Sequence, residues 1–194
     1  MIDKSAEKKL EEILTKHSDL WNTKSKYLSF IRGGIRRGCW EKHPVKLQII
    51  QERRVQIPNP NPRGNKPTVW GCKCEICEGL FKQSDIQVDH IRSHFSKFTD
   101  INDIQQFVID MVMVTKDDLR LVCKECHEVV SLSQKDSVTF DEARLKKEYI
   151  HICKDKKLLV AKLKEFGVES IPKTLKTQKE LLSDLMLNLG EQND

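Results

Sequence analysis

The sequence predicts an α+β protein in which a small, metal-stapled module is flanked by mostly helical N- and C-terminal extensions. Two Cys-x2-Cys pairs begin at Cys74 and Cys123, short alternating apolar and polar segments lie between them, and apolar residues recur at helical spacing on either side. A chain of 194 residues allows one ordinary domain or a small core with extensions. Because 38% of the residues are hydrophobic, we expect a modest core that needs additional stabilisation.

Residues 1–57 are expected to form a helical, basic arm. Apolar spacing predicts a first helix over about 5–21 and a second that starts near Ser25, although glycines at 33, 34 and 38 weaken the second. Pro44 suits the first turn of a third helix, which reaches about Val55. Residues 58–68 contain four prolines and are expected to form an extended linker.

Residues 69–140 are expected to form the metal-stapled module. A turn over residues 69–79 closes at Gly79, and a helix is expected to begin near Glu125. Between them we expect two short strands and an inserted helix, over Ile86–Ile91, Leu119–Cys123 and Asp103–Met113 respectively.

The C-terminal extension, residues 141–194, shows helical spacing over about 142–154, 157–166 and 178–189. The helix, glycine, loop and helix from Leu158 to Leu185 are vaguely similar to SAP-like DNA-binding helix pairs. A helical hairpin that packs on the core, or on a second copy in a homodimer, is the alternative.

The net charge of +5 conceals an uneven distribution. Residues 24–66 carry 11 Lys and Arg against 2 Asp and Glu, whereas residues 67–140 carry 8 against 12. A local positive excess suits a phosphate backbone, and a solvated basic face is the alternative.

We expect no membrane contact, because no stretch approaches the roughly 18 apolar residues of a membrane span. With no signal peptide in the N-terminal residues, we expect an intracellular, cytoplasmic protein with reduced thiols.

Four cysteines in two knuckle pairs are predicted to hold a structural Zn2+ ion. They are Cys74, Cys77, Cys123 and Cys126. Four thiolates at this spacing are the donor set of a closed tetrahedral zinc site, and the bound ion adds folding free energy to a module of low apolar content. Redox-active pairs and unliganded thiols are the alternatives. Cys72 is too close to Cys74 for the usual knuckle spacing, and Cys39 and Cys153 are expected to be ordinary buried thiols.

Three further polar residues lie between the two cysteine pairs or directly after the second. Asp89 and His90 are expected at the end of a strand, and His127 follows Cys126. In order and spacing, residues 70–131 resemble the HNH endonuclease family, whose pattern is Cys-x2-Cys, Asp-His, an apolar strand, and Cys-x2-Cys-His opening a helix. The segment 30–37 and Trp40 resemble phage-type members, so the resemblance covers about residues 25–131.

The resemblance implies a ββα-metal fold and a metal-dependent DNA endonuclease, encoded by a phage and acting in its host's cytoplasm. It implies that His90 is the general base and that Asp89 and His127 bind a catalytic Mg2+ or Mn2+ ion. Phosphodiester hydrolysis suits a base that titrates near neutrality and a cation that neutralises developing charge. Where the family has Asn, this chain has Asp118, or Asp117 one residue earlier, as the residue that would orient the imidazole. The Lys of the family's Cys-His-x-x-Lys is absent.

Double-stranded DNA is the expected partner, held by phosphate contacts that do not read sequence. The arginines expected to make these contacts are Arg32, Arg36, Arg37, Arg53, Arg54, Arg63 and Arg92. Homing, degradation of host DNA, restriction and packaging all remain open as biological roles. The competing hypothesis is a zinc-stabilised, non-catalytic DNA-binding or packaging accessory protein derived from the same fold.

Overall fold

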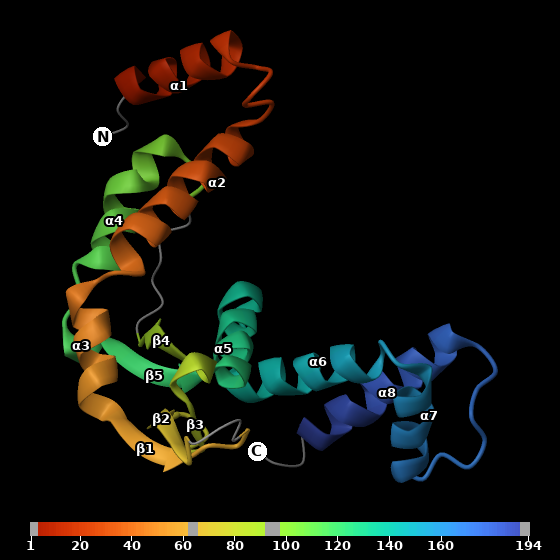
Figure 1. Ribbon diagram of the computed structural model, residues 1–194. Helices are drawn as coiled ribbons and strands as arrows, with labels where there is room; N and C mark the ends of the chain where they lie inside the picture. Colours follow the sequence, from red (N-terminus) through yellow and green to blue (C-terminus); the bar gives the residue numbers. More distant parts are fainter. Residues whose placement is uncertain (1–3, 62–65, 92–97, 191–194) are drawn as a thin grey trace. The chain divides into compact units, whose positions relative to one another are not determined.

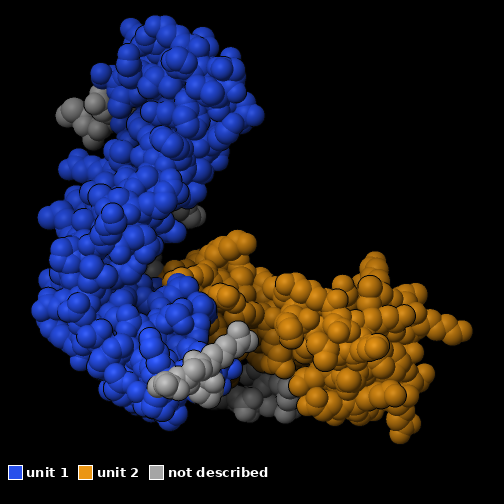
Figure 2. All heavy atoms as spheres, viewed as in Figure 1, with its two compact units in different colours: residues 1–124 blue, residues 125–194 orange. Residues whose placement is uncertain are grey.

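The computed structural model describes residues 4–61, 66–91 and 98–190 (Figure 1). It confirms the α+β class expected from the sequence. The chain divides into two compact units, residues 1–124 and residues 125–194 (Figure 2). The division falls inside the second cysteine pair, so the helical arm expected over residues 1–57 and most of the expected module belong to the same unit.

The N-terminal unit begins with three α-helices. Helix α1 spans Lys4–Lys16, α2 spans Lys24–Ile35, and α3 spans Pro44–Arg53. Thr23 caps α2 by accepting a hydrogen bond from the backbone N–H of Lys26, and Pro44 occupies the first turn of α3. The glycines at 33 and 34 do not interrupt α2, which continues into a π-helical turn over Arg36–Trp40.

Three antiparallel strands follow in the order β1-β2-β3: Arg54–Pro58, Thr68–Lys73 and Leu80–Lys82. The Pro-rich segment joins two neighbouring strands of one sheet, and Pro58 pairs with Thr68 where the two strands meet it. Pro58 is compatible with this arrangement because β1 is an edge strand.

A second sheet pairs β4 (Ile86–His90) with β5 (Leu119–Cys123) in antiparallel register. Between them lies α4 (Ile104–Val112), preceded by a 3-10 turn whose capping box joins Asp100 and Asp103. Helix α5 (Lys124–Asp136) follows β5 without an intervening loop. These elements agree closely with those predicted from the sequence.

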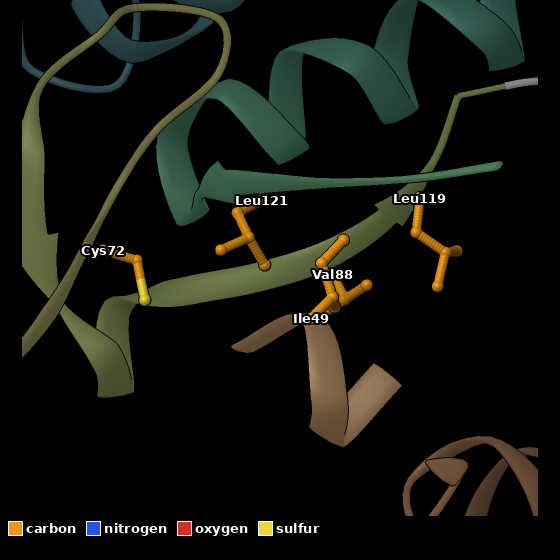
Figure 3. Packing of buried hydrophobic residues seen from close by; sticks show 5 residues of the cluster. All are labelled: Ile49, Cys72, Val88, Leu119 and Leu121. Atoms are coloured by element: carbon orange, nitrogen blue, oxygen red, sulfur yellow. The ribbon is translucent and has the colours of Figure 1, made fainter. Parts of the chain in front are cut away.

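The core of the N-terminal unit joins α3 to both sheets. Its buried residues are Ile49, Cys72, Val88, Leu119 and Leu121, which pack together as Figure 3 shows. A second cluster, formed by Leu28, Phe98, Phe107 and Met111, includes residues of α2 and α4. Trp40 packs against both clusters, so the π-helical turn is held against the paired strands β4 and β5.

The C-terminal unit continues with α6 (Phe140–Ile152), α7 (Lys156–Glu165) and α8 (Leu175–Gly190). Thr139 and Glu142 form a capping box at the start of α6, and Gly167 takes a φ of 79° where the chain leaves α7. The last three helices share a core of their own, with Leu159, Leu163 and Leu182 fully buried. Among the described residues, no helix has both the length and the apolar character that crossing a bilayer requires.

Gly71 provides a stability test, because β2 passes closely between β1 and β3 there. A Cβ atom at this position would lie 2.5 Å from Cδ1 of Ile57 and 2.6 Å from the backbone oxygen of Phe81. We expect Gly71→Ala to lower the free energy of unfolding by about 1–3 kcal/mol in chemical denaturation. Gly34→Ala is the control: its Cβ meets nothing within 4 Å, and helix propensity favours Ala by up to about 1 kcal/mol. Equal stability of the two variants would contradict this prediction.

Candidate zinc centre and the Asp89-His90 site

The sulfur atoms of Cys74, Cys77, Cys123 and Cys126 all lie within 4.8 Å of one another. The Sγ atoms of Cys77 and Cys123 are 4.0 Å apart. In a tetrahedral site with Zn–S bonds of about 2.3 Å, neighbouring sulfur atoms lie about 3.8 Å apart. The cluster therefore has the donor set and nearly the dimensions needed to hold a metal such as zinc.

Backbone hydrogen bonds shape the first cysteine pair. The backbone N–H of Cys74 donates to the oxygen of Gly79 at 2.8 Å, and Glu78 takes a φ of 61° to complete the turn. The N–H of Glu75 donates to the backbone oxygen of Leu121, and the Glu75 carboxylate accepts from the N–H of Leu121, both at 2.8 Å. These two bonds attach the turn to β5, which ends in Cys123.

The electrostatic environment of Cys74 favours a thiolate. Burial raises the pKa of its thiol, but hydrogen bonds from the backbone N–H groups of Cys77, Cys123 and Ile76 outweigh burial and bring the pKa to about 7. Because a metal binds the thiolate and not the thiol, this environment prepares Cys74 to act as a ligand.

The remaining cysteines differ in exposure. Cys72 is fully buried, and burial raises the pKa of its thiol, which suits its place outside the cluster. Cys39 is exposed, so the prediction that it is a buried thiol is wrong: the π-helical turn directs it to the surface. Cys153 is partly buried at the end of α6.

Asp89 and His90 lie at the end of β4 and are both buried, with exposed fractions of 8% and 7%. Asp89 stands directly opposite Arg120 on β5. The Nε and Nη2 atoms of Arg120 donate to one carboxylate oxygen of Asp89, Oδ2, at 2.9 and 2.8 Å. The negative charge of Asp89 is thus balanced by a cross-strand ion pair.

The His90 ring is oriented by backbone and aromatic contacts. Its Nε2 lies 3.3 Å from the backbone oxygen of Met111 at the end of α4. Because a carbonyl oxygen can only accept, Nε2 carries the proton of the neutral ring and Nδ1 carries the basic lone pair. The Trp40 ring lies 4.4 Å from the imidazole centroid to centroid, at an interplanar angle of 32°.

Burial is the main cause that lowers the pKa of His90 below its ordinary value of 6.5, and Arg36 adds to the lowering. The Met111 carbonyl and the charges of Asp89 and Asp118 act in the opposite direction without cancelling it. The imidazole is therefore neutral near pH 7, the state in which it can accept a proton.

Asp118 holds the strand ends together. Its carboxylate accepts hydrogen bonds from the backbone N–H and the hydroxyl of Thr115, at 2.8 and 2.7 Å, and so caps the 3-10 turn over Lys116–Asp118. Its backbone oxygen accepts from the N–H of Ile91 at 2.8 Å. Asp118 thus fixes the end of β4 beside the start of β5, while the Met111 carbonyl takes the hydrogen bond from the His90 ring. Asp117, the alternative position, is exposed.

The remaining residues of the predicted site differ in their burial and in their partners. His127 is partly buried near the start of α5, directly after Cys126. Arg32, Arg36 and Arg37 are exposed on α2 and the π-helical turn. Two further arginines have partners within the N-terminal unit: Arg53 pairs with Glu75 at 2.5 Å, and the guanidinium of Arg54 lies 4.3 Å from the ring centroid of Trp70. Arg63 and Arg92 lie outside the described residues.

Sequence reasoning missed Arg120, the Met111 carbonyl and the stacking role of Trp40. For Arg120 a signal existed, because opposite charges meet on the two predicted strands once Asp89 is aligned with Arg120. The Met111 and Trp40 contacts depend on how α4 and the π-helical turn pack, which no local pattern encodes.

The zinc prediction can be tested by metal content. We expect Cys74→Ser to lose the bound zinc ion and to unfold at a lower temperature, because three thiolates no longer close the site. Zinc can be measured with a colorimetric chelator after denaturation, beside thermal unfolding. Cys39→Ser, which changes an exposed cysteine outside the cluster, should keep the zinc content of the wild type. Unchanged zinc in Cys74→Ser would refute this ligand set.

Comparisons with family models, with curated proteins and with solved structures found no match to this chain. A functional assignment therefore has to come from the residues and their geometry. The features available for it are the cysteine cluster, the oriented His90 ring beside Asp89, and the exposed arginines of α2 and the turn that follows.

Proposed function

We propose that the protein is a metal-dependent endonuclease that hydrolyses phosphodiester bonds of double-stranded DNA. The observation that carries the proposal is the setting of His90: a buried imidazole at the end of β4 whose Nε2 is engaged by the Met111 carbonyl and whose ring lies against Trp40. A ring held in this tautomer, next to the carboxylate of Asp89, has the properties of a general base. The order of the cysteine pairs, Asp89-His90 and His127 along the chain supports the same chemistry.

In the proposed reaction, Nδ1 of His90 accepts a proton from the attacking water. The water oxygen bonds to phosphorus, the bond from phosphorus to the 3′ oxygen breaks, and the leaving oxygen takes a proton from solvent. The imidazolium that forms is stabilised by the Met111 carbonyl and by the charges of Asp89 and Asp118, which all favour the protonated ring. Trp40 restricts the ring orientation through this step by stacking on it.

Asp89 and His127 are the proposed protein ligands of a Mg2+ or Mn2+ ion. Carboxylate oxygen suits either ion, and imidazole nitrogen is acceptable to Mn2+ more than to Mg2+. Such an ion would neutralise charge on the phosphate and on the leaving oxygen. In this proposal zinc bound by the four cysteines has a structural role and takes no part in the hydrolysis.

Exposed arginines provide the proposed DNA contacts. Arg32, Arg36 and Arg37 occupy consecutive turns at the end of α2 and in the π-helical turn, which also supplies Trp40 to the His90 ring. Arg36 is close enough to His90 to influence its pKa. Basic side chains beside the proposed base would bring a phosphate backbone to the site.

A nicking assay on supercoiled plasmid tests the proposal. We expect cleavage that requires Mg2+ or Mn2+ and stops with EDTA, and we expect His90→Ala to lower the rate by about 100-fold or more, because the general base is lost. His151→Ala, which changes an exposed histidine on α6, should cleave like the wild type. If the wild type binds DNA but never nicks it, the competing hypothesis of a non-catalytic DNA-binding accessory protein is favoured.

The salt dependence of DNA binding tests the arginine contacts. For Arg37→Gln we expect weaker binding to a short duplex, and a slope of log K against log salt that is smaller in magnitude by about 0.9, the value for one lost phosphate contact. Arg144→Gln is the matched control, because Arg144 is exposed on α6 and pairs with Asp141. Fluorescence anisotropy over a series of salt concentrations measures both. An unchanged slope for Arg37→Gln would exclude Arg37 from the interface.

A further inference from the structure

We propose that Arg120 couples binding of the divalent cation to binding of DNA: its guanidinium holds Asp89 while DNA is absent and turns toward a phosphate when DNA arrives. The inference rests on the function proposed above and concerns regulation of the same site. It starts from the ion pair between Asp89 and Arg120, which sequence reasoning did not anticipate.

The geometry of this pair blocks part of a cation site. Two donor atoms of Arg120, Nε and Nη2, are directed at Oδ2 of Asp89, at 2.9 and 2.8 Å. A metal ion at that oxygen would compete for the lone pairs that now accept these hydrogen bonds. The two residues face each other in the β4–β5 register, so the strands hold the guanidinium beside the carboxylate.

Charge balance gives the direction of the coupling. A divalent cation beside the guanidinium would place three positive charges around one buried carboxylate, and like charges repel strongly where water is scarce. A phosphodiester adds the missing negative charge. Cation and DNA should therefore each bind more tightly when the other is present, as thermodynamic linkage requires.

Arg120 is also able to meet a phosphate. The side chain of Asp89 is 10% exposed and that of Arg120 is 24% exposed, so Arg120 is the more accessible member of the pair. Two of its five N–H donors serve Asp89 in this structure, and guanidinium groups bind phosphate oxygens through paired donors.

A binding cycle tests the coupling without relying on cleavage. The parent protein is zinc-loaded, full-length His90→Ala, which leaves DNA intact, and electron paramagnetic resonance of free Mn2+ reports the bound ion. We expect a short duplex to raise the Mn2+ affinity of the parent by about tenfold. Adding Arg120→Gln should raise the Mn2+ affinity of the DNA-free protein by a similar factor, and should reduce the effect of the duplex to less than about threefold.

Control variants separate a specific role of Arg120 from a general effect of removing one positive charge and from unfolding of the variant. Arg144→Gln removes an exposed arginine from α6 and should behave like the parent. The parent can refute the coupling even if Arg120→Gln does not fold: equal Mn2+ affinity with and without duplex overturns the proposal. A folded Arg120→Gln with the parent's affinities overturns it as well. A wild type that nicks plasmid but shows no coupling refutes only the role of Arg120, whereas a wild type that never nicks refutes the endonuclease.

Discussion

The antiparallel pairing of β4 with β5 in one register is the constraint on which the rest of the structure depends. It places Asp89 opposite Arg120, His90 opposite Leu119, and Ile86 opposite Cys123. If one strand slipped by one residue along the other, every side chain of that strand would move to the other face of the sheet. The packing of Val88, Leu119 and Leu121 with Ile49 of α3 opposes such a slip, because all of these side chains are buried in one cluster. The same register therefore sets the position of Cys123, a member of the cysteine cluster, at one end of the strand pair and of His90 at the other.

The helical elements next to the paired strands β4 and β5 also hold the His90 ring in place. Helix α4 presents the Met111 carbonyl to the His90 ring, and the π-helical turn supplies the Trp40 ring that stacks on it. Both elements share the cluster that contains Leu28 and Phe107. The orientation of the His90 ring thus depends on residues from about 28 to 111, so α2 and the turn that follows it help to position the proposed base.

The sequence predicted those elements whose pattern is local. β4, β5, α4 and the cysteine cluster follow from alternation, helical spacing and the Cys-x2-Cys pairs, each of which is contained in a short window. β1 was missed because it ends at Pro58, where a Pro-rich segment begins, and its partner β2 lies beyond that segment. The exposure of Cys39 was missed because a π-helical turn shifts the faces expected of an α-helix. The pair of Asp89 and Arg120 depends on strand register, which becomes known only when the two strands are aligned.

The cross-strand ion pair also restricts how this sequence can change over evolutionary time. Removal of Arg120 would leave the Asp89 carboxylate buried and uncompensated, which is costly in a folded protein. Positions 89 and 120 are therefore expected to vary together, and a lineage that keeps the aspartate is under pressure to keep the arginine. Distant relatives could then be sought by an Asp-His strand end followed, one helix later, by an apolar strand with arginine at its second position. This covariation would remain detectable after the surrounding apolar residues had diverged.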